Sequence, residues 1–290
     1  MSVKALVLTG YGLNCDFETQ HVLRLAGAQA VRVHISQLTG TAHQPPDQRL
    51  TDYQILVFVG GFAWGDDHGA GVLLATRLGN HLRDQLEQFL EQGGLVLGIC
   101  NGFQALVNLG LLPMLDGVRR REVALIANDC GNFQDRWVNL LVEEHSPCVF
   151  TRGLKQLTLP IRHGEGKFVA PPETLSRLED MGCVALRYAD GRGRPARGRW
   201  PANPNGSLND IAGICDSTGR IFGLMPHPEA FYRLSQHPTW TAQREKARRK
   251  GRELDPLTEG QGLAIFRNAV AAAGGSPSGA ASGAASGAAA

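Results

Sequence analysis

The sequence predicts an α/β fold built on an open, mixed and mostly parallel β-sheet with flanking helices. Short apolar runs, bounded by glycine or acidic turns, have the length of buried parallel strands and are too short for helices. Between them lie segments whose apolar residues recur every three to four positions, as in amphipathic helices. With 290 residues, 43% of them hydrophobic, the chain can bury a substantial core. This alternation of strand and helix is typical of α/β proteins.

The first half of the chain contains four predicted strands and three predicted helices. The strands are expected over residues 4–8, 30–35, 55–59 and 95–99, and the helices over 16–26, 78–91 and 103–112. The pair Gly93-Gly94 ends the second helix directly before the fourth strand. Cys100 is therefore predicted to lie at the carboxyl end of a central strand, followed by a tight turn and a helix.

The second half is predicted to be richer in strands and to complete a single domain over residues 1–273. Strands separated by Gly, Pro and Asp turns are expected over 138–142, 156–161, 184–188, 211–215 and 221–224, before a last helix over 262–272. Residues 274–290 contain three copies of Ser-Gly-Ala-Ala and no large apolar side chain. This composition cannot offset the entropy of ordering, so a flexible Gly/Ala/Ser low-complexity tail is predicted.

Charge and cysteine content argue against several classes of protein. A formal net charge of +2 does not fit a strongly basic nucleic-acid binder or a disordered acidic chain. No apolar run approaches the roughly 20 residues that span a bilayer, and no secretory signal is visible, so we expect no membrane partner and a cytoplasmic location.

The six cysteines form no C-x-x-C pair or Cys/His array, which argues against a disulfide framework or zinc site. The basic segment 243–252 is expected to be a solvated helical face, although it could contact RNA or an acidic partner.

The segment Gly98-Ile99-Cys100-Asn101-Gly102 has the G-x-C-x-G form of a nucleophile elbow. Its glycines allow a strained turn between strand and helix, which exposes the nucleophile above the sheet. A helix that begins after Cys100 also favours the thiolate through its dipole. The pattern favours a nucleophile over the alternative, a buried structural cysteine beside an ordinary turn.

A catalytic thiol needs a base, and the segment around His227 offers one together with an orienting carboxylate. In extended backbone, alternate residues point the same way, so Glu229 can hold the His227 ring against Cys100. The prolines on either side of His227 favour that extended backbone. A surface turn is the alternative interpretation of the same residues.

Backbone donors for an oxyanion are expected at two strand ends. Gly60-Gly61 follows the predicted strand 55–59 and could offer an unobstructed N–H, with the N–H of Asn101 as a second donor. A plain β-turn is the alternative for Gly60-Gly61. Because open α/β sheets bind ligands at the carboxyl ends of their strands, both donors are expected on the same edge as Cys100.

Taken together, these segments resemble the triad, or class I, glutamine amidotransferases. The elbow continues as Phe103-Gln104, as in that family. Longer segments narrow the resemblance to the glutaminase component of phosphoribosylformylglycinamidine synthase, the amidating enzyme of purine biosynthesis. They are Gly60-Gly61-Phe62-Ala63-Trp64-Gly65-Asp66, His163-Gly164-Glu165-Gly166, Asn203-Pro204-Asn205-Gly206-Ser207 with Asp210-Ile211-Ala212-Gly213-Ile214, and Met225-Pro226-His227-Pro228-Glu229. The resemblance covers residues 4–270 and implies the flavodoxin-like fold of the class.

The resemblance also implies a role for each matching residue. Cys100 would attack the side-chain amide of glutamine, His227 would move the proton, and Glu229 would orient His227. The oxyanion hole would comprise Gly60, Gly61 and Asn101, and the substrate-binding residues would be Gln104, His163 and Gly164. Ammonia would pass to a synthetase subunit that uses MgATP to convert formylglycinamide ribonucleotide into its amidine. This chain itself would need no cofactor and no metal.

Some features depart from the family pattern or leave alternatives open. Ala230 stands where the family has an arginine, and residues 233–257 resemble an insertion before the last helix. Asp66-Asp67-His68 could ligate a metal, but a solvated loop is expected there. Two other functions remain open: a free-standing cysteine hydrolase, such as a γ-glutamyl hydrolase or a peptidase, and a non-catalytic subunit that senses glutamine.

Overall fold

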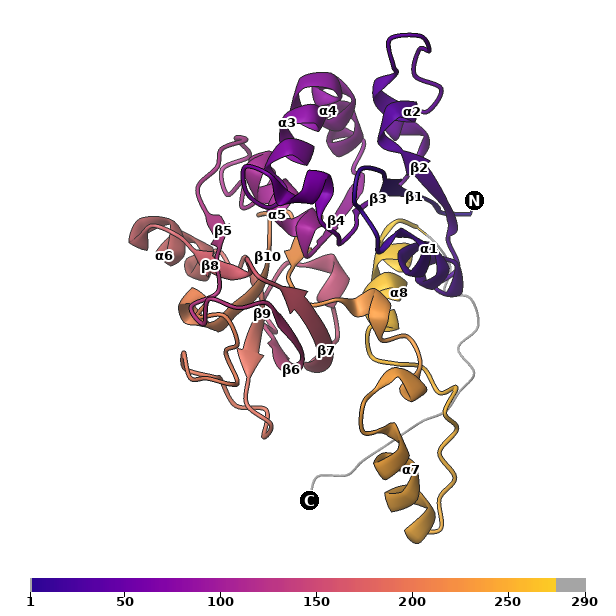
Figure 1. The fold of residues 1–290 in the computed structure, drawn as a ribbon, viewed down its shortest axis with the longest axis vertical. Helices are drawn as coiled ribbons and strands as arrows, with labels where there is room; N and C mark the ends of the chain where they lie inside the picture. The colour runs from indigo at the N-terminus through magenta and orange to yellow at the C-terminus, as the bar shows by residue number, and fades with distance from the viewer. Residues whose placement is uncertain (1, 275–290) are drawn as a thin grey trace.

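The computed structural model describes residues 2–274, and one mixed β-sheet runs through its centre (Figure 1). Its strands are β1 (Lys4–Thr9), β2 (Gln29–His34), β3 (Ile55–Phe58), β4 (Leu95–Ile99), β6 (Gln134–Val142), β7 (Gln156–His163), β9 (Val184–Ala189), β10 (Ile211–Cys215) and β11 (Ile221–Leu224). They are ordered β2-β1-β3-β4-β11-β10-β9-β6-β7. Neighbours are parallel from β2 to β11 and antiparallel from there to β7, so only β10 and β6 run against the others. The expected mixed, mostly parallel sheet is confirmed.

All nine strands of this sheet were predicted from the sequence, with differences only at their ends. Every residue of β3 and β4 is buried, as expected for central parallel strands covered on both faces. The carboxyl ends of β1, β3, β4, β11, β9 and β7 share one edge of the sheet. The candidate site residues all follow or end strands at this edge.

Helices cover both faces of the sheet. They are α1 (Asp16–Leu25), α2 (Ile35–Thr39), α3 (Val72–His81), α4 (Arg83–Glu91), α5 (Asn101–Asn108), α6 (Pro172–Asp180), α7 (Trp240–Arg249) and α8 (Leu263–Ala272). Short 3-10 turns are η1 (Leu50–Asp52), η2 (Ala63–Asp66), η3 (Val149–Thr151), η4 (Leu208–Asp210), η5 (Pro228–Ala230) and η6 (Leu234–Gln236). Helices α1 and α8 pack together on one face, and α3, α4 and α5 lie on the other (Figure 1). No helix of residues 2–274 is long and apolar enough to cross a membrane.

Two predicted helices have different bounds in the structure. The single helix expected over 78–91 is wrong: α3 and α4 meet at Leu82, whose backbone leaves the helical region (φ −123°, ψ 15°) while its side chain is buried. The helix expected over 103–112 ends at Asn108, because Gly110 adopts φ +70° and its N–H bonds the carbonyl of Val107. That left-handed glycine closes α5 in the usual way for a helix C-terminus.

A second, two-stranded antiparallel sheet lies beside the main one and was not predicted. It pairs β5 (Ala124–Ile126) with β8 (Lys167–Val169), and α6 lies next to it in Figure 1. Strands of three residues carry no readable alternation of apolar and polar side chains. Their pairing brings the segment after β7 back over the sheet edge, where it reaches the candidate site.

The segment around α7 forms an arm that extends away from the sheet (Figure 1). A bridge between Arg233 and Glu259 ties its two ends together, and no residue of α7 is buried. The arm corresponds to the insertion expected over 233–257, and its helix agrees with the expected solvated face. The tail expected over 274–290 lies, apart from Gly274, outside the described residues.

Candidate active site

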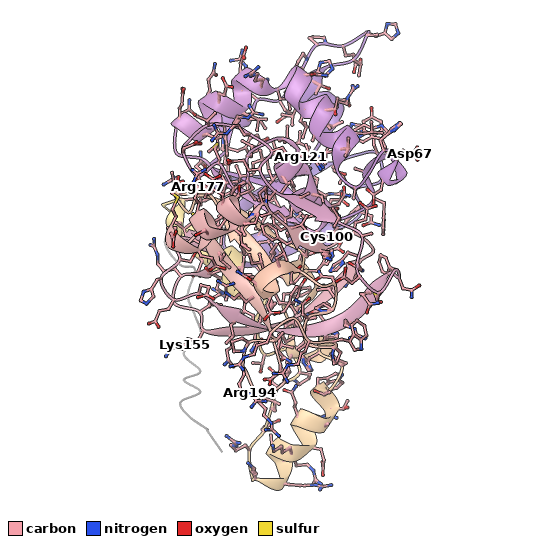
Figure 2. All side chains as sticks on the ribbon, turned by 90° about the vertical axis from the view of Figure 1, so that its left-hand side faces the viewer. Asp67, Cys100, Arg121, Lys155, Arg177 and Arg194 are labelled. Carbon is pink, nitrogen blue, oxygen red and sulfur yellow. The ribbon has the colours of Figure 1, made fainter. Side chains whose placement is uncertain are left out.

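Cys100 occupies a strained turn between β4 and α5, near the middle of the molecule (Figure 2). Its backbone has φ +51° and ψ −108°, a conformation that costs a non-glycine residue about 1–3 kcal/mol. Two hydrogen bonds hold it there: its N–H donates to Leu224 O at 2.8 Å, and the N–H of Gln104 donates to its carbonyl at 3.1 Å. A Cβ at Gly102 would overlap the carbonyl oxygen of Phe58. The nucleophile elbow predicted from the sequence is therefore present, and its glycine is sterically required.

His227 and Glu229 follow β11 and form a buried pair. The distance from His227 Nδ1 to Glu229 Oε1 is 2.6 Å, and the two residues are 2% and 0% exposed. Burial alone lowers the pKa of His227, but the Glu229 carboxylate and the neighbouring Cys100 raise that pKa well above its ordinary value. Within the described residues His227 Nε2 has no hydrogen-bond partner, so this nitrogen remains available for proton exchange. The geometry is that of a base oriented by a carboxylate.

The outer strand β7 closes the site from the far side of the sheet. Pro160 O accepts the N–H of His227 at 2.8 Å, and Arg162 O accepts the Cys100 thiol at 3.5 Å. β7 is the last strand in the sheet order, yet it contacts residues that follow β4 and β11. The sheet is therefore curved, so that the edge strand β7 contacts the segments that follow the central strands β4 and β11.

The Gly60-Gly61 loop passes directly beside the His227 ring. A Cβ at Gly60 would lie 2.7 Å from His227 Cε1, so a side chain there would displace the imidazole. The carbonyl of Gly60 accepts the N–H groups of Asn14 and Cys15, both at 3.2 Å, which fixes the loop. The close approach explains why glycine is needed here, and it places the loop backbone next to the His227 imidazole.

Asn101 ties the elbow to the loop after β3. Its side-chain amide donates to Asp66 Oδ1 at 2.8 Å and to Gln104 Oε1 at 3.2 Å, while its side-chain oxygen accepts the N–H of Ala63. Burial, together with the charge of Glu165, raises the pKa of Asp66. The solvated loop expected over Asp66-Asp67-His68 is thus correct only for its two exposed members, because the Asp66 carboxylate is half-buried and bonds the elbow.

His163 ends β7 and presents one free nitrogen to the interior. Its Nδ1 lies 3.1 Å from Asn128 Oδ1, while the Asn128 amide group donates to the carbonyls of His163 and Asn132. Because the oxygen end of Asn128 faces the ring, Nδ1 carries the hydrogen and Nε2 is an acceptor. Burial and the charge of His227 lower the pKa of His163 to about 3, which keeps the ring neutral. Nε2 is buried and has no partner among the described residues.

The segment that follows His163 is held by the elbow helix and by the Asn-Pro-Asn-Gly-Ser segment. The Gln104 amide donates to the backbone oxygen of Glu165. Asn205 Nδ2 donates to Gly166 O at 2.7 Å, and Ser207 Oγ accepts the N–H of Phe168 at 2.9 Å. A Cβ at Gly164 would lie 3.9 Å from the Phe133 ring, in ordinary van der Waals contact. The His-Gly-Glu-Gly and Asn-Pro-Asn-Gly-Ser segments, which carry the family resemblance, are thus brought together around His163.

Cys15 was missed by the sequence analysis, although its thiol lies against the base. Its Sγ is 3.9 Å from His227 Nδ1, it is 5% exposed, and burial raises its pKa. Cys15, His227 and Glu229 place ligand atoms within 4.8 Å of one another, a grouping that could hold a metal ion. We interpret it as part of a proton-transfer site, because the Nδ1 of His227 is already engaged by Glu229. No local pattern marked Cys15, since 212 residues separate it from its contact.

Comparisons with known proteins found similar chains over nearly the whole sequence. A family described as the CobB/CobQ-like glutamine amidotransferase domain matches residues 2–272. The chain is 44% identical over 270 residues to the phosphoribosylformylglycinamidine synthase subunit PurQ of Methanococcus maripaludis, covering 92% of this chain and 96% of the relative. With the PurQ subunit of Dehalococcoides mccartyi the identity is 46%, with the same coverage.

Two solved structures are also similar. A chain of the PurLQS structure from Thermotoga maritima superposes with a TM-score of 0.65 at 28% identity, covering 93% of this chain and 99% of that one. A glutamine amidotransferase from the same organism, at 14% identity and a TM-score of 0.51, shares the fold over 93% of this chain and 97% of its own.

Proposed function

Because this chain belongs to the CobB/CobQ-like glutamine amidotransferases and, within them, to the PurQ subunits of phosphoribosylformylglycinamidine synthase, we propose that it hydrolyses glutamine with a Cys100-His227-Glu229 triad. The ammonia passes to the ATP-dependent synthetase subunit, which converts formylglycinamide ribonucleotide into formylglycinamidine ribonucleotide in purine biosynthesis. The observation that carries the triad assignment is the 2.6 Å contact between the buried His227 and Glu229 beside the elbow of Cys100. Residues 1–273 act as one amidotransferase domain in this proposal.

The reaction divides into acylation and hydrolysis. The Cys100 thiolate attacks the amide carbon of glutamine, and His227 gives its proton to the departing ammonia. Water, deprotonated by His227, then releases glutamate from the glutamyl thioester. Glu229 stabilises the imidazolium and fixes the ring, with its hydrogen bond at Nδ1 leaving Nε2 directed to the reacting atoms.

The oxyanion is stabilised by backbone N–H groups of Gly60, Gly61 and Asn101. Asn101 begins α5, so its N–H points out of the helix N-terminus, where the helix dipole favours a negative charge. The glycine loop is sterically confined by the His227 ring, as the short distance from a Cβ at Gly60 indicates. Donors that are fixed before the reaction stabilise the oxyanion at little further cost.

Glutamine is recognised by Gln104, His163 and Gly164. The unpartnered Nε2 of the neutral His163 is an acceptor, and it suits an N–H group of the substrate. Gln104 lies on the first turn of the elbow helix and holds the backbone of Glu165, so it links the nucleophile to the substrate-binding segment. A buried acceptor that gains a donor only when substrate is bound contributes to specificity, since an analogue without the donor leaves it unpaired.

The chain acts in the cytoplasm with its synthetase partner, and the partner is the subunit that uses MgATP. The test is steady-state glutamine hydrolysis by the purified chain alone and then with the synthetase, its ribonucleotide substrate and MgATP. We expect the partner to raise turnover roughly tenfold or more, because docking would order the exposed part of the loop after β3, Phe62, Gly65 and Asp67-His68, over the bound glutamine. Equal turnover in both conditions, or cleavage of γ-glutamyl peptides without a partner, would favour a free-standing hydrolase. Absence of any glutamyl thioester would favour a glutamine-sensing subunit.

Replacing Gly166 by alanine should damage the substrate-binding segment specifically. A Cβ at Gly166 would overlap the imidazole of His163, which Asn128 holds in place. We expect glutamine turnover to fall by up to about 10²-fold, because small displacements in an active site have such effects. The melting temperature should fall as well, reflecting about 1–3 kcal/mol of overpacking. Gly191→Ala is the matched control, since nothing lies within 4 Å of the Cβ position there; a similar loss in both variants would contradict the role of His163.

A further inference from the structure

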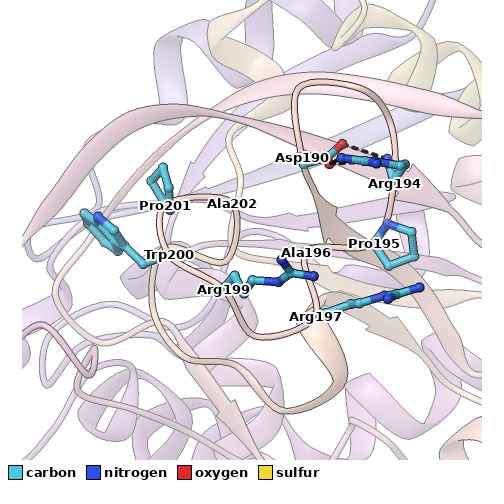
Figure 3. Close-up of a pocket in the computed structure, with 9 residues that line it drawn as sticks. All are labelled: Asp190, Arg194, Pro195, Ala196, Arg197, Arg199, Trp200, Pro201 and Ala202. Atoms are coloured by element: carbon cyan, nitrogen blue, oxygen red, sulfur yellow. Dashed lines mark hydrogen bonds and ion pairs between the residues drawn. The ribbon is translucent and has the colours of Figure 1, made fainter.

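The connection between β9 and β10 encloses a hollow of about 360 Å³ that the proposed reaction does not use (Figure 3). Three arginines and one aspartate contribute charged groups to its lining: Arg194, Arg197, Arg199 and Asp190. Trp200 forms another part of the wall. The volume of the hollow lies at the lower end of the range for small-molecule sites, roughly 300–1,000 Å³. The hollow is therefore suited to one compact ligand.

The charges of the lining do not cancel. Arg194 forms a two-pronged ion pair with Asp190, with Nη2 and Nε at 2.8 and 2.9 Å from Oδ2. Over residues 2–274 neither Arg197 nor Arg199 forms an ion pair with a carboxylate. In Figure 3 the side chain of Arg199 lies between Trp200 and Arg197. Guanidinium groups bind phosphate oxygens through bidentate, charge-assisted hydrogen bonds, so two of them without an ion-pair partner suit a phosphate.

Hydrogen bonds to the buried Asp210 and to Asn203 fix the backbone that carries these arginines. The N–H groups of Arg197 and Gly198 donate to the carboxylate of Asp210 at 2.5 and 2.8 Å, and Asn203 Nδ2 donates to the same carboxylate at 2.9 Å. Asp210 is only 4% exposed. Asn203 also donates its own N–H to Arg199 O at 2.9 Å. A loop that is already ordered loses less entropy when it binds a ligand.

Trp200 supplies an apolar surface in the same wall as the arginines. It is 56% exposed, and the guanidinium of Arg136, from β6, lies 4.3 Å from its ring centroid. Arg136 thus covers part of the indole, and the remainder faces solvent. Exposed indoles stack readily on planar aromatic rings, as in sites for nucleotide bases. A lining that contains both guanidinium groups and an indole matches a ligand that has both a phosphate and a planar ring.

We propose that this hollow binds a nucleoside phosphate of mononucleotide size, with its phosphate at Arg197 and Arg199 and its base on Trp200. The site lies on the edge of the sheet that also carries Cys100, because β9 and β4 point the same way. It connects to the substrate-binding segment through Asn205, which follows the hollow in sequence and donates to Gly166 O. The proposal concerns binding and does not depend on the reaction proposed above.

Calorimetric titration of the purified chain with AMP and ADP tests this proposal directly. We expect measurable binding of the nucleotides, weakened about tenfold or more in the double variant Arg197→Gln/Arg199→Gln, because each guanidinium contributes charge-assisted hydrogen bonds. Arg192→Gln is the matched control: it removes the same charge from the same connection, outside the lining of the hollow. Trp200→Leu should lower the affinity for AMP and ADP severalfold and leave the weaker binding of ribose 5-phosphate unchanged.

The remaining titrations identify which part of the nucleotide the hollow binds. Inorganic pyrophosphate and adenosine are titrated separately, and melting temperatures confirm that each variant is folded. Pyrophosphate binding as tight as that of ADP, and insensitive to Trp200→Leu, would overturn the nucleotide assignment. Adenosine binding as tight as that of AMP would remove the role of the arginines. No binding of AMP or ADP at millimolar concentration, or equal losses in the Arg192 control and the double variant, would overturn the site itself.

Discussion

Replacing Cys100 by alanine is expected to abolish glutamine-dependent amidation by the complex with the synthetase and to leave ammonia-dependent amidation intact. Only the release of ammonia from glutamine needs the thiolate, whereas free ammonia enters the synthetase reaction downstream of it. Loss of the nucleophile from a catalytic triad lowers turnover by about 10³-fold or more. The measurement is amidation of the ribonucleotide with glutamine and, separately, with ammonium as the nitrogen source. Glutamine-dependent activity within a few-fold of the wild type would show that Cys100 is not the nucleophile.

Covalent labelling separates a nucleophile from a merely exposed thiol. Cys100 is 5% exposed, whereas Cys130 is the exposed cysteine of the described residues. A simple alkylating reagent should therefore react fastest at Cys130. A glutamine analogue with an electrophilic side chain should instead add once, at Cys100, because only that thiol meets the bound substrate. Labelling of Cys130 by the glutamine analogue, or continued labelling in the Cys100→Ala variant, would contradict the assignment.

The parts of the site that follow from local sequence were predicted well. The elbow depends on neighbours in the chain: Gly98 and Gly102 leave room for the turn, and the apolar run before Cys100 makes a buried strand. His227 and Glu229 are two residues apart, and their side chains meet as predicted. The extended backbone expected for this segment holds only at His227 (φ −106°, ψ 90°), because Glu229 already belongs to the 3-10 turn η5. The strands were readable for the same reason, since a short apolar run between turn residues has the length of a buried strand and is too short for a helix.

The parts that depend on tertiary contacts were not predictable from patterns. The position of Cys15 beside His227 requires the loop after β1 to reach the segment after β11. The contact of β7 with Cys100 depends on how far the sheet curls, which no single strand specifies. Asn128 belongs to the same group, because its bond to His163 joins the segment before β6 to the end of β7. Each contact is a property of the assembled sheet.

The break between α3 and α4 shows how a periodic pattern can be misread. Apolar residues recur at helical spacing through Leu78, Leu82 and Leu86, and all three are buried. The burial that the spacing predicts is therefore correct. The backbone at Leu82 nevertheless leaves the helix, directly after Gly79, Asn80 and His81, which are weak helix formers. Spacing reports which side chains are buried, and it does not report whether the helix axis is continuous.

The second large effect is expected at the pair of His227 and Glu229. His227→Ala should reduce glutamine turnover nearly as much as the loss of Cys100, because the leaving ammonia then lacks a proton donor. Glu229→Gln should lose less, about 10⁴-fold where loss of a triad nucleophile or base costs about 10⁶-fold, since it keeps the size of the side chain and removes its charge. The pH dependence provides the sharper test. The carboxylate raises the pKa of His227 by stabilising the protonated ring, so removing its charge must lower that pKa.

Protonated His227 is the form that donates to ammonia, and it disappears as the pH rises through its pKa. The alkaline limb of turnover against pH should therefore move to lower pH in Glu229→Gln, while ammonia-dependent amidation by the same complex shows no shift. A uniform loss at every pH, with the alkaline limb unmoved, would mean that Glu229 acts only in packing.

The triad must also act as one unit, because an imidazole without a thiol has nothing to activate. Cys100→Ala/His227→Ala should consequently be no worse than either single variant, and losses that multiply would place the two residues in separate steps.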